Sequence, residues 1–478
     1  MSVLGHLEPK KVFDFFEELC AIPHGSGNNT QLSNYLVKFA VERGLEHYQD
    51  AAENVIIIKP ATPGYEEAEP VIIQGHMDMV CEKAADCAKD MATEGLDLAI
   101  DGDMIYAKGT TLGGDDGIAV AMGLALLDSD NLAHPRLEVV ITTDEETGMD
   151  GAVALDASVL QGKRMLNIDS EDEGIFTVSC AGGAMVKAAS PVKREHFTGT
   201  AVTIIIDGLA GGHSGTEIDK GRGNADMLLG RVLYAAAKKT SLRIVSVEGG
   251  SKDNAIPAAA KAVVYAADVA DLRKSCAEMD AVIRAEYAVT DPGVRICVVN
   301  GGEGSAMDEA STQRVISLLT CAPNGVQVMS ADIDGLVQTS LNLGVLYTNE
   351  DQVIARFCVR SSVESQKTML LERLECLTRQ LGGEIEISGV YPGWAYRQDS
   401  PLRDLMTTVF VEQYGSAPKI EALHAGLECG LFAGKIPGLD CVSFGPDLLD
   451  IHTPRERMSV SSMQRTWRFL LELLRRMN

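Results

Sequence analysis

Several short apolar segments of this chain end directly in a histidine or in acidic residues. The segment 70–74 is one of them, and it is followed by His76 and Asp78 in the motif Gly-His-Met-Asp. A short apolar run of this kind indicates a buried strand, which here would carry His76 to the edge of a sheet. A carboxylate two residues further on can fix the tautomer of a metal-binding histidine. A single histidine is more often structural, so the interpretation depends on the segments that follow.

The acids of two further segments stand next to strand or helix patterns. Asp115 and Asp116 lie in the glycine-rich segment 112–117, directly before an apolar helical pattern. Alone, this segment is better interpreted as a surface turn, although its glycines also let a carboxylate approach a cation closely. Residues 144–146 are three consecutive acids at the end of the β-branched run 139–143. Carboxylates in such a row repel one another unless a cation or full solvation compensates them, and we favour the cation.

Two more segments complete the pattern. Asp169 ends the short apolar strand pattern 165–168, and His452 follows a strand and turn at 442–446. The chain therefore places two histidines and at least three acids at the ends of separate strands, where open α/β sheets hold their binding sites. Nitrogen and oxygen ligands without thiolate suit zinc, cobalt or manganese. Five ligands exceed the need of one tetrahedral zinc, whereas two metals about 3.5–4 Å apart can share a bridging carboxylate.

The order of helix and strand patterns predicts an α/β fold. Helical patterns at 12–19 and 30–43 alternate with a strand at 54–58, which indicates a mainly parallel sheet flanked by helices. The character changes near residue 190, and the strand 200–206 begins an inserted α+β lid domain. An amphipathic helix at 462–477 is expected to pack on the sheet. The expected limits are 1–187 for the first part of the catalytic domain, 188–390 for the insertion and 391–478 for the second part.

Composition predicts a cytoplasmic protein with no nucleic-acid or membrane partner. The 478 residues carry a formal net charge of −26, which disfavours binding to nucleic acids and to anionic membranes. The first ten residues hold no signal-peptide core, and no apolar run of about 18 residues predicts a transmembrane helix. The 11 cysteines form no Cys-x-x-Cys pair. Cys297 and Cys358 lie in apolar runs, and we expect them to be buried free thiols in a reducing compartment.

The order of these motifs resembles that of the co-catalytic zinc exopeptidases. The matching segments are Gly-His-Met-Asp, Gly-Asp-Asp-Gly, Asp-Glu-Glu-Thr-Gly, Ile-Asp-Ser and Ile-His-Thr-Pro, and the resemblance runs over nearly the whole chain. Residues 167–171, 424–430 and 450–454 are similar in particular to the aminoacyl-histidine dipeptidases (cytosol non-specific dipeptidases). Gly114, where alanine is expected, and Asp116, where many relatives have asparagine, depart from the pattern without changing the types of ligand.

The resemblance implies the zinc exopeptidase fold and a site for two zinc ions per chain. The implied ligands are His76 and Asp169 for one zinc, Glu146 and His452 for the other, and Asp115 as the bridge between them. Asp78 would orient the first histidine, and Glu145 would act as general base on a water held between the metals. Cobalt or manganese are expected substitutes. The residues alone do not decide which of the two neighbouring glutamates is the base.

The resemblance also assigns substrate contacts to the insertion and to one later glycine, and each of these residues has a structural alternative. His213, in a Gly-Gly-His-Ser-Gly segment, would stabilise the oxyanion, although the segment alone indicates a flexible turn. Arg360 ends a strand and would bind the substrate carboxylate, or it forms a structural ion pair. Gly426 would donate its backbone N–H to the same carboxylate, or it is an ordinary loop glycine. Asn254 would assist, or it is a turn residue.

Three functions fit these residues. The first is zinc-dependent hydrolysis of unblocked dipeptides, including carnosine-like Xaa-His peptides. A dipeptide is then the expected partner, and a homodimer is left open. The second is an N-acyl-amino-acid deacylase with the same dinuclear site. The third is a metal-binding protein that has lost activity, and the intact Glu145 argues against it.

Overall fold

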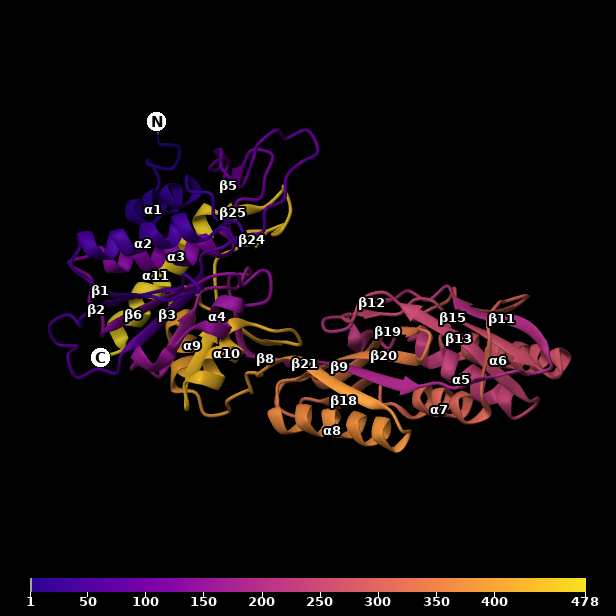
Figure 1. Ribbon diagram of the computed structural model, residues 1–478. Helices are drawn as coiled ribbons and strands as arrows, with labels where there is room; N and C mark the ends of the chain where they lie inside the picture. Colours follow the sequence, from indigo (N-terminus) through magenta and orange to yellow (C-terminus); the bar gives the residue numbers. More distant parts are fainter. Residues whose placement is uncertain (1) are drawn as a thin grey trace. The chain divides into compact units, whose positions relative to one another are not determined.

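The computed structural model describes residues 2–478 and divides them into two compact units (Figure 1). The first unit runs up to Ser179 and also contains Tyr396–Ala422 and Leu427–Asn478. The second unit consists of Cys180–Ala395 and Leu423–Gly426. Both ends of the described chain therefore contribute to one unit, and its middle forms the other. The sequence-based limits at 187/188 and 390/391 stay a prediction.

The first unit is built on an eight-stranded sheet whose central strands β6, β3, β7 and β23 run parallel. This confirms the predicted mainly parallel α/β fold. The flanking pairs β1–β2, β2–β6 and β23–β8 are antiparallel. In spatial order the strands are β1 (Glu46–Gln49), β2 (Val55–Lys59), β6 (Leu137–Thr142), β3 (Val71–His76), β7 (Arg164–Asn167), β23 (Asp440–Ser443), β8 (Ile175–Cys180) and β22 (Lys419–Leu423).

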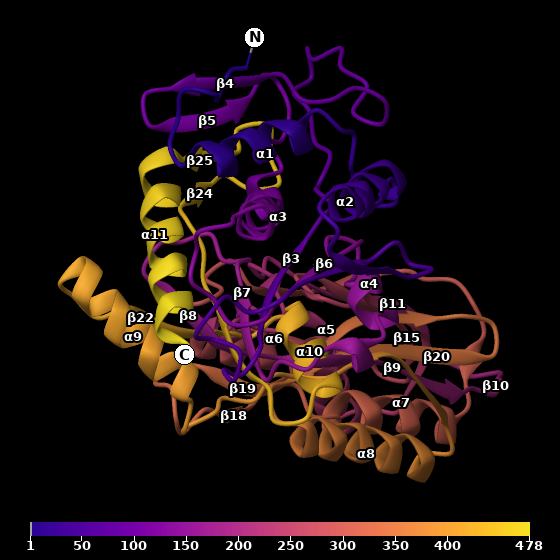
Figure 2. The same ribbon diagram turned by 90° about the vertical axis from the view of Figure 1, so that its left-hand side faces the viewer.

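Helices cover both faces of this sheet, as Figure 2 shows, with α1, α2 and α3 on one face and α4 and α10 on the other. All 14 residues of α3 are buried, because this helix is apolar along most of its length and lies between β3 and α1. The helices of the unit are α1 (Lys10–Cys20), α2 (Thr30–Glu42), α3 (Gly114–Leu127), α4 (Asp150–Ala154), α9 (Pro401–Tyr414), α10 (Glu428–Lys435) and α11 (Val460–Arg476). The predicted helices near 12–19, 30–43 and 462–477 are confirmed as α1, α2 and α11.

A small four-stranded sheet joins the C-terminal part of the first unit to residues 98–107. It contains β4 (Leu98–Asp101), β5 (Met104–Ala107), β24 (Leu448–Leu449) and β25 (Arg457–Ser459). Because β24 and β25 pair with each other, the loop between them is closed at its base. This loop carries His452, so the small sheet determines where that histidine lies.

The second unit contains a nine-stranded antiparallel sheet with four helices, which agrees with the α+β insertion. Apolar side chains of the sheet and of the helices form one core. The strands in spatial order are β16 (Arg295–Asn300), β11 (Thr200–Asp207), β15 (Ala260–Ala266), β13 (Leu242–Gly250), β19 (Val337–Thr348), β20 (Gln352–Ser361), β9 (Gly182–Pro191) and β21 (Glu384–Tyr391), with β18 (Gly325–Met329) beside β19. The helices are α5 (Ala225–Ala237), α6 (Val269–Glu286), α7 (Glu309–Cys321) and α8 (Glu364–Gln380), and the short strands β12 (Gly212–His213) and β14 (Ala255–Ile256) pair separately.

All 11 cysteines are free thiols. Cys358 is buried as predicted, but the prediction was wrong for Cys297, which is exposed. Cys297 lies on β16, the edge strand, where Ile296 and Val298 face the core and the alternate side chain points away from it. None of the helices in residues 2–478 combines the length and the apolar character needed to cross a membrane.

Candidate metal centre

The five predicted metal ligands lie together in the first unit, close to the carboxyl ends of its parallel strands. His76 is the last residue of β3, Glu146 follows β6, and Asp169 follows β7. Asp115 stands at the start of α3, and His452 lies in the loop between β24 and β25. The parallel order β6-β3-β7 brings the three strand ends to one edge of the sheet.

The carboxylate of Asp115 lies between the two histidines. Its Oδ1 is 3.2 Å from Nε2 of His76, and its Oδ2 is 3.1 Å from Nε2 of His452. Nε2 of His76 is also 3.6 Å from Oδ1 of Asp169, and Nε2 of His452 is 2.9 Å from Oε1 of Glu146. These contacts form two groups that share Asp115, and donor atoms of His76, Asp115 and Glu146 also lie within 4.8 Å of one another. The assignment of individual ligands to two metals stays a prediction.

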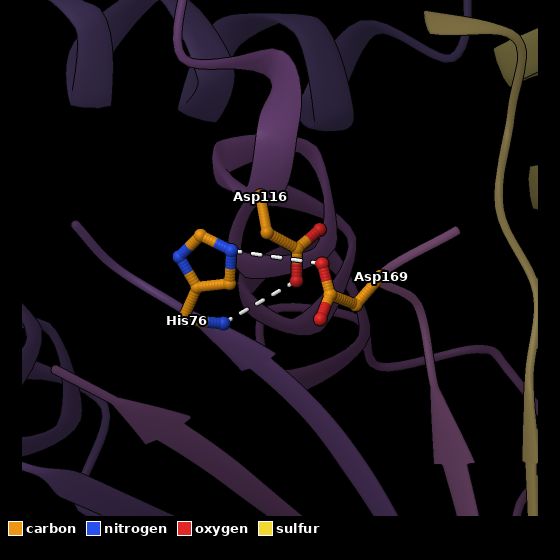
Figure 3. Close-up of side chains that lie close together, drawn as sticks. All are labelled: His76, Asp116 and Asp169. Atoms are coloured by element: carbon orange, nitrogen blue, oxygen red, sulfur yellow. Dashed lines mark hydrogen bonds and ion pairs between the residues drawn. The ribbon is translucent and has the colours of Figure 1, made fainter. Parts of the chain in front are cut away.

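Asp116 is a further acid at this place that was not predicted as a site residue (Figure 3). Its Oδ2 accepts a hydrogen bond from the backbone N–H of His76 at 3.3 Å, and His76, Asp116 and Asp169 each offer an atom within 4.8 Å of the others. A Cβ on Gly75 would lie 2.4 Å from the same oxygen, so only glycine fits there. Asp116 therefore holds the end of β3 against the start of α3, and burial raises its pKa well above the usual range.

Asp78, which was predicted to orient His76, contacts both this histidine and the acidic loop. Nδ1 of His76 is 3.0 Å from the backbone carbonyl of Asp78 and 3.4 Å from its carboxylate. That carboxylate accepts hydrogen bonds from the backbone N–H groups of Glu145 and Glu146, at 3.1 and 3.4 Å, and from the hydroxyl of Ser26 at 2.8 Å. Asp78 thus fixes the histidine ring and the acidic loop at the same time.

The electrostatics of the centre fit a bound cation. Burial raises the pKa of Glu145 to about 9 and that of Asp169 to about 6, with further increases from the neighbouring acids. Hydrogen bonds with Asp115 and Glu146 raise the pKa of His452 to about 10. Surplus negative charge that draws protons onto its histidines also attracts divalent cations, and an imidazole and carboxylate set is one that zinc accepts. The residues present therefore suit a dinuclear metal site.

Glu456 is a supporting residue that the sequence interpretation missed. Its buried carboxylate accepts hydrogen bonds from the backbone N–H groups of Leu112, Gly113 and Gly114, at 2.7, 3.1 and 2.8 Å. These N–H groups belong to the first turn of α3 and to the loop before it, where the helix itself provides no acceptor for them. Glu456 therefore fixes the loop that carries Asp115. Its position four residues after His452 was the available signal in the sequence.

Glu428 is a second missed residue, and its hydrogen-bond network joins three strands of the sheet. Its side chain is fully buried and accepts hydrogen bonds from Nε2 of Gln74 at 2.5 Å and from Oγ1 of Thr142 at 2.7 Å. Oε1 of Gln74 in turn accepts a hydrogen bond from Nδ2 of Asn167 at 2.6 Å. Gln74, Thr142 and Asn167 belong to β3, β6 and β7, so this network ties together the strands that precede the candidate ligands.

Two backbone positions at the centre are strained. Asp144, next to the proposed base, has φ of 53°, and His452 has φ of 59°. Non-glycine residues rarely adopt this left-handed region, and such residues concentrate at functional sites. The side chain of Asp144 compensates locally, because its Oδ1 accepts hydrogen bonds from the backbone of Gly27 at 2.6 Å and from Asn29 at 2.8 Å.

The second unit holds the other predicted site residues, beginning with His213. Its Nδ1 lies 3.2 and 3.1 Å from the backbone N–H groups of Gly215 and Thr216. Two donors aimed at one ring nitrogen require that nitrogen to be an acceptor, so the proton of the neutral ring is on Nε2. Burial, with the nearby charge of Arg360, lowers the pKa of His213. Nε2–H of the neutral ring is therefore its hydrogen-bond donor, and His213 lies at the end of β12, directly before a turn.

Arg360 is buried and forms no ion pair with the acidic residues of the described chain, so the structural ion pair left open by the sequence is not found. One Nη lies 3.5 Å from the hydroxyl of Tyr391, and Nε has no hydrogen-bond partner. His424, which was not predicted as a site residue, lies close enough to Arg360 for the charge of the arginine to affect its pKa. Its Nε2 is 2.7 Å from Oγ of Ser340, and burial, together with Arg360 and His213, lowers its pKa to about 3.

The two remaining predicted site residues are Asn254 and Gly426. Asn254 is exposed and precedes β14, and its backbone carbonyl accepts a hydrogen bond from the N–H of Ser214 at 2.8 Å. Because β14 pairs with β12, Asn254 lies beside the segment that carries His213. Gly426 is half-buried and follows His424 by two residues in the segment Leu423–Gly426 of the second unit.

The fold and these residues define the class of protein. The sequence model of peptidase family M20/M25/M40 matches residues 72–476, and the chain belongs to this family. This result confirms the family resemblance.

Individual relatives are similar over their full length. The chain is 38% identical over 480 residues to the cytosol non-specific dipeptidase of Escherichia coli strain K12, and the match covers 99% of each chain. The crystal structure of aminoacylhistidine dipeptidase from Vibrio alginolyticus aligns with a TM-score of 0.93 at 37% identity, over 98% of this chain and 97% of that one. Aminopeptidase PepT from Bacillus cereus has a TM-score of 0.56 at 17% identity, covers 98% of this chain and 99% of its own, and shares the fold alone.

Proposed function

We propose that this protein is a dinuclear zinc dipeptidase that hydrolyses the peptide bond of unblocked dipeptides, Xaa-His peptides among them. The observation that carries the proposal is the pair of histidine and acid groups joined at Asp115, with Glu145 beside them. The similarity to two named dipeptidases over nearly the full chain supports the same substrate class.

The proposed zinc ligands follow the two groups of side chains. His76 and Asp169 would hold one ion, Glu146 and His452 the other, and Asp115 both. When bound, the metals would act as Lewis acids and would lower the pKa of a coordinated water. Cobalt or manganese could replace zinc, because the same nitrogen and oxygen donors accept them.

Glu145 is the proposed general base. It would accept the proton of the attacking water and pass it to the leaving amine. For this it must be ionised, although burial, together with the neighbouring acids, raises its pKa to about 9. Positive charge at the neighbouring ligand positions would lower that pKa again. Its backbone N–H is held by Asp78, which limits the positions that the side chain can reach.

The residues of the second unit would recognise the substrate. Arg360, which has no carboxylate partner, suits the free carboxylate of a dipeptide, and the backbone N–H of Gly426 would add a second donor. Nε2–H of His213 suits an oxyanion, because it donates a hydrogen bond without carrying a full charge. Asn254 would assist from the neighbouring strand.

Cytoplasmic location is part of this proposal. All 11 cysteines are free, which is typical of a reducing compartment, and the relative from Escherichia coli is named as a cytosol enzyme.

The decisive experiment compares matched pairs of substrates on the zinc-loaded protein. Dipeptides such as Gly-His, Leu-His and β-alanyl-histidine are assayed beside their N-acetylated forms. Hydrolysis of the peptide bond in the unblocked members alone supports the dipeptidase. Release of acetate from the blocked members would instead identify an N-acyl-amino-acid deacylase, and zinc binding without any turnover would identify an inactive metal-binding protein.

A further inference from the structure

A hollow of about 470 Å³ opens beside the metal centre within the first unit. This volume lies within the range of about 300–1,000 Å³ that small-molecule pockets occupy. Glu146, one of the proposed zinc ligands, is part of its wall, so the hollow adjoins the reacting centre directly. We call it the methionine hollow, and its lining residues are Gly25, Ser26, Asn28, Met79, Val80, Cys81, Glu82, Met91, Ala92, Glu146 and Thr147.

The walls of the methionine hollow are fixed by hydrogen bonds between segments. Segment 79–82 is held on one side by the backbone of residues 24–26 and on the other by Thr111. The side-chain amide of Asn28 donates to the carbonyl of Ala92 at 3.0 Å, which joins the opposite wall. A Cβ on Gly25 would lie 2.4 Å from Sγ of Cys81, so the two segments touch closely. The hollow is therefore largely preformed.

The chemistry of the lining selects the kind of occupant. Its floor is apolar and rich in sulfur, with Met79 and Met91 buried and Cys81 exposed at the opening. Methionine side chains are flexible and polarisable, so such a floor adapts to apolar groups of different shapes. The charged members of the lining are Glu82 and Glu146, and none of its residues is basic. The hollow thus accepts neutral apolar groups and repels carboxylates.

We propose that the methionine hollow binds the side chain of the amino-terminal residue of the dipeptide and favours medium-sized apolar side chains over acidic ones. The assignment rests on the proposed function. Glu82, the acid of the lining that is not a proposed zinc ligand, repels the carboxylate end of a dipeptide and attracts the end that carries the free ammonium group. None of the lining residues is basic, so the hollow offers no partner for the carboxylate of the dipeptide and suits the amino-terminal residue.

The first test compares substrates that differ only in this side chain. On the zinc-loaded protein, kcat/KM for Leu-His should exceed that for Gly-His by roughly tenfold or more, because burying the additional apolar side chain stabilises the bound state. Asp-His should be poorer than Gly-His. Equal values for Leu-His and Asp-His would overturn the assignment.

The second test fills the hollow. Cys81→Phe should reduce the preference for Leu-His over Gly-His by about tenfold, chiefly through KM for Leu-His. Lys83→Phe is the matched control, because Lys83 is exposed two residues away and does not line the hollow. The assignment fails if Cys81→Phe lowers both substrates equally or changes neither. Glu82→Gln gives a second variant with little steric change, and it should improve Asp-His relative to Gly-His.

A binding measurement separates this inference from the proposed function. Titration calorimetry with L-leucine and glycine, the amino-terminal products, requires no turnover. The zinc-loaded parent should bind L-leucine roughly tenfold more tightly than glycine, and Cys81→Phe should remove that difference. If the protein binds L-leucine more tightly than glycine but hydrolyses no dipeptide, only the proposed function is contradicted. If the protein hydrolyses Gly-His but shows no preference for leucine, only the assignment of the methionine hollow is contradicted.

Discussion

The two polar clusters of this protein shift the pKa of a histidine in opposite directions. In the first unit, hydrogen bonds with Asp115 and Glu146 raise the pKa of His452 to about 10. In the second unit, burial, together with Arg360 and His213, lowers the pKa of His424 to about 3. The first cluster has surplus negative charge and the second surplus positive charge. The contrast supports the proposal that the first cluster binds metal cations and that the second binds an anionic group of the substrate.

The two clusters also differ in how many of their polar atoms are already paired. The carboxylates that hold the loops of the first cluster, Asp78 and Glu456, each accept several backbone hydrogen bonds. In the second cluster Nε of Arg360 has no hydrogen-bond partner, and one Nη donates a long hydrogen bond of 3.5 Å to the hydroxyl of Tyr391. A buried guanidinium with one long hydrogen bond retains donors without a partner, and these donors suit a ligand carboxylate.

The largest expected effect comes from removing the shared carboxylate of the first cluster. Asp115→Ala should lower metal content from two zinc equivalents per chain to less than one and should remove detectable peptidase activity, because both groups lose a ligand. His76→Ala should release mainly one equivalent. Metal analysis after zinc loading and dialysis measures both variants. A plateau of one equivalent in the parent protein would show that Asp115 does not serve two metals.

The next effect separates chemistry from metal binding within the first cluster. Glu145→Gln keeps the shape of the side chain but cannot accept a proton, so we expect a loss of about 10²–10⁴-fold in kcat with zinc content unchanged. The same substitution at Glu146 should instead lower zinc content. If Glu145→Gln retained near-normal turnover at full zinc occupancy, Glu146 would have to be reconsidered as the base.

The sequence predicts those parts of the first cluster that depend on local patterns, and it does not predict contacts between residues far apart in the chain. His76, Glu146 and Asp169 end strands whose apolar pattern is visible locally, so their meeting at one sheet edge could be expected from the sequence. The division into ligands and base came from the family resemblance. Glu456 was missed because its partner Leu112 lies 344 residues away, and nothing local indicates which backbone groups an acid will bind.

Glu428 and, in the second unit, His424 were missed for the same reason, because their partners lie far away in the sequence. Glu428 contacts Gln74 across 354 residues, and His424 contacts Ser340 across 84. Both lie in the segment 424–430, which the resemblance had singled out without assigning these roles. Cys297 shows the converse case, since an apolar run predicted burial but the edge position of β16 left one face exposed. Sequence periodicity gives the faces of a strand, whereas its place in the sheet decides which faces are covered.

A smaller effect is expected from the second cluster, and it tests whether that cluster recognises an anion. Arg360→Ala should raise KM for free dipeptides by about 10–100-fold with a smaller change in kcat, because a carboxylate contact is mostly ground-state binding. His213→Ala should mainly lower kcat, since an oxyanion donor acts in the transition state.

Amidated dipeptides provide the control for Arg360. They lack the carboxylate, so the parent enzyme should bind them about as weakly as the Arg360→Ala variant binds free dipeptides, and the variant should not discriminate further between the two. A variant that still distinguished free from amidated substrates by the full factor would remove Arg360 from the carboxylate site.

The smallest effect concerns stability and lies away from both clusters. Asp226, in the first turn of α5, is fully buried and neither of its carboxylate oxygens has a hydrogen-bond partner. A Cβ on Gly249 would lie 1.7 Å from its Oδ1, so the carboxyl group fills a space that only glycine leaves open. Burial raises the pKa of Asp226 well above its usual range, which means that the folded state prefers the protonated acid.

The sign of the pH dependence follows from that shift. A group whose pKa is raised on folding contributes its stability fully below the unfolded value of about 3.9 and loses it as pH rises towards the folded pKa. Asp226→Asn cannot ionise, so the free energy of unfolding of the variant relative to the parent should increase between pH 5 and pH 9, by about 1–3 kcal/mol. Denaturant unfolding followed by circular dichroism measures this difference. Asp271→Asn, at an exposed acid in the first turn of α6, is the control and should show no comparable trend. Parallel pH profiles for the parent and the Asp226 variant would mean that the carboxyl group is solvated in the folded protein.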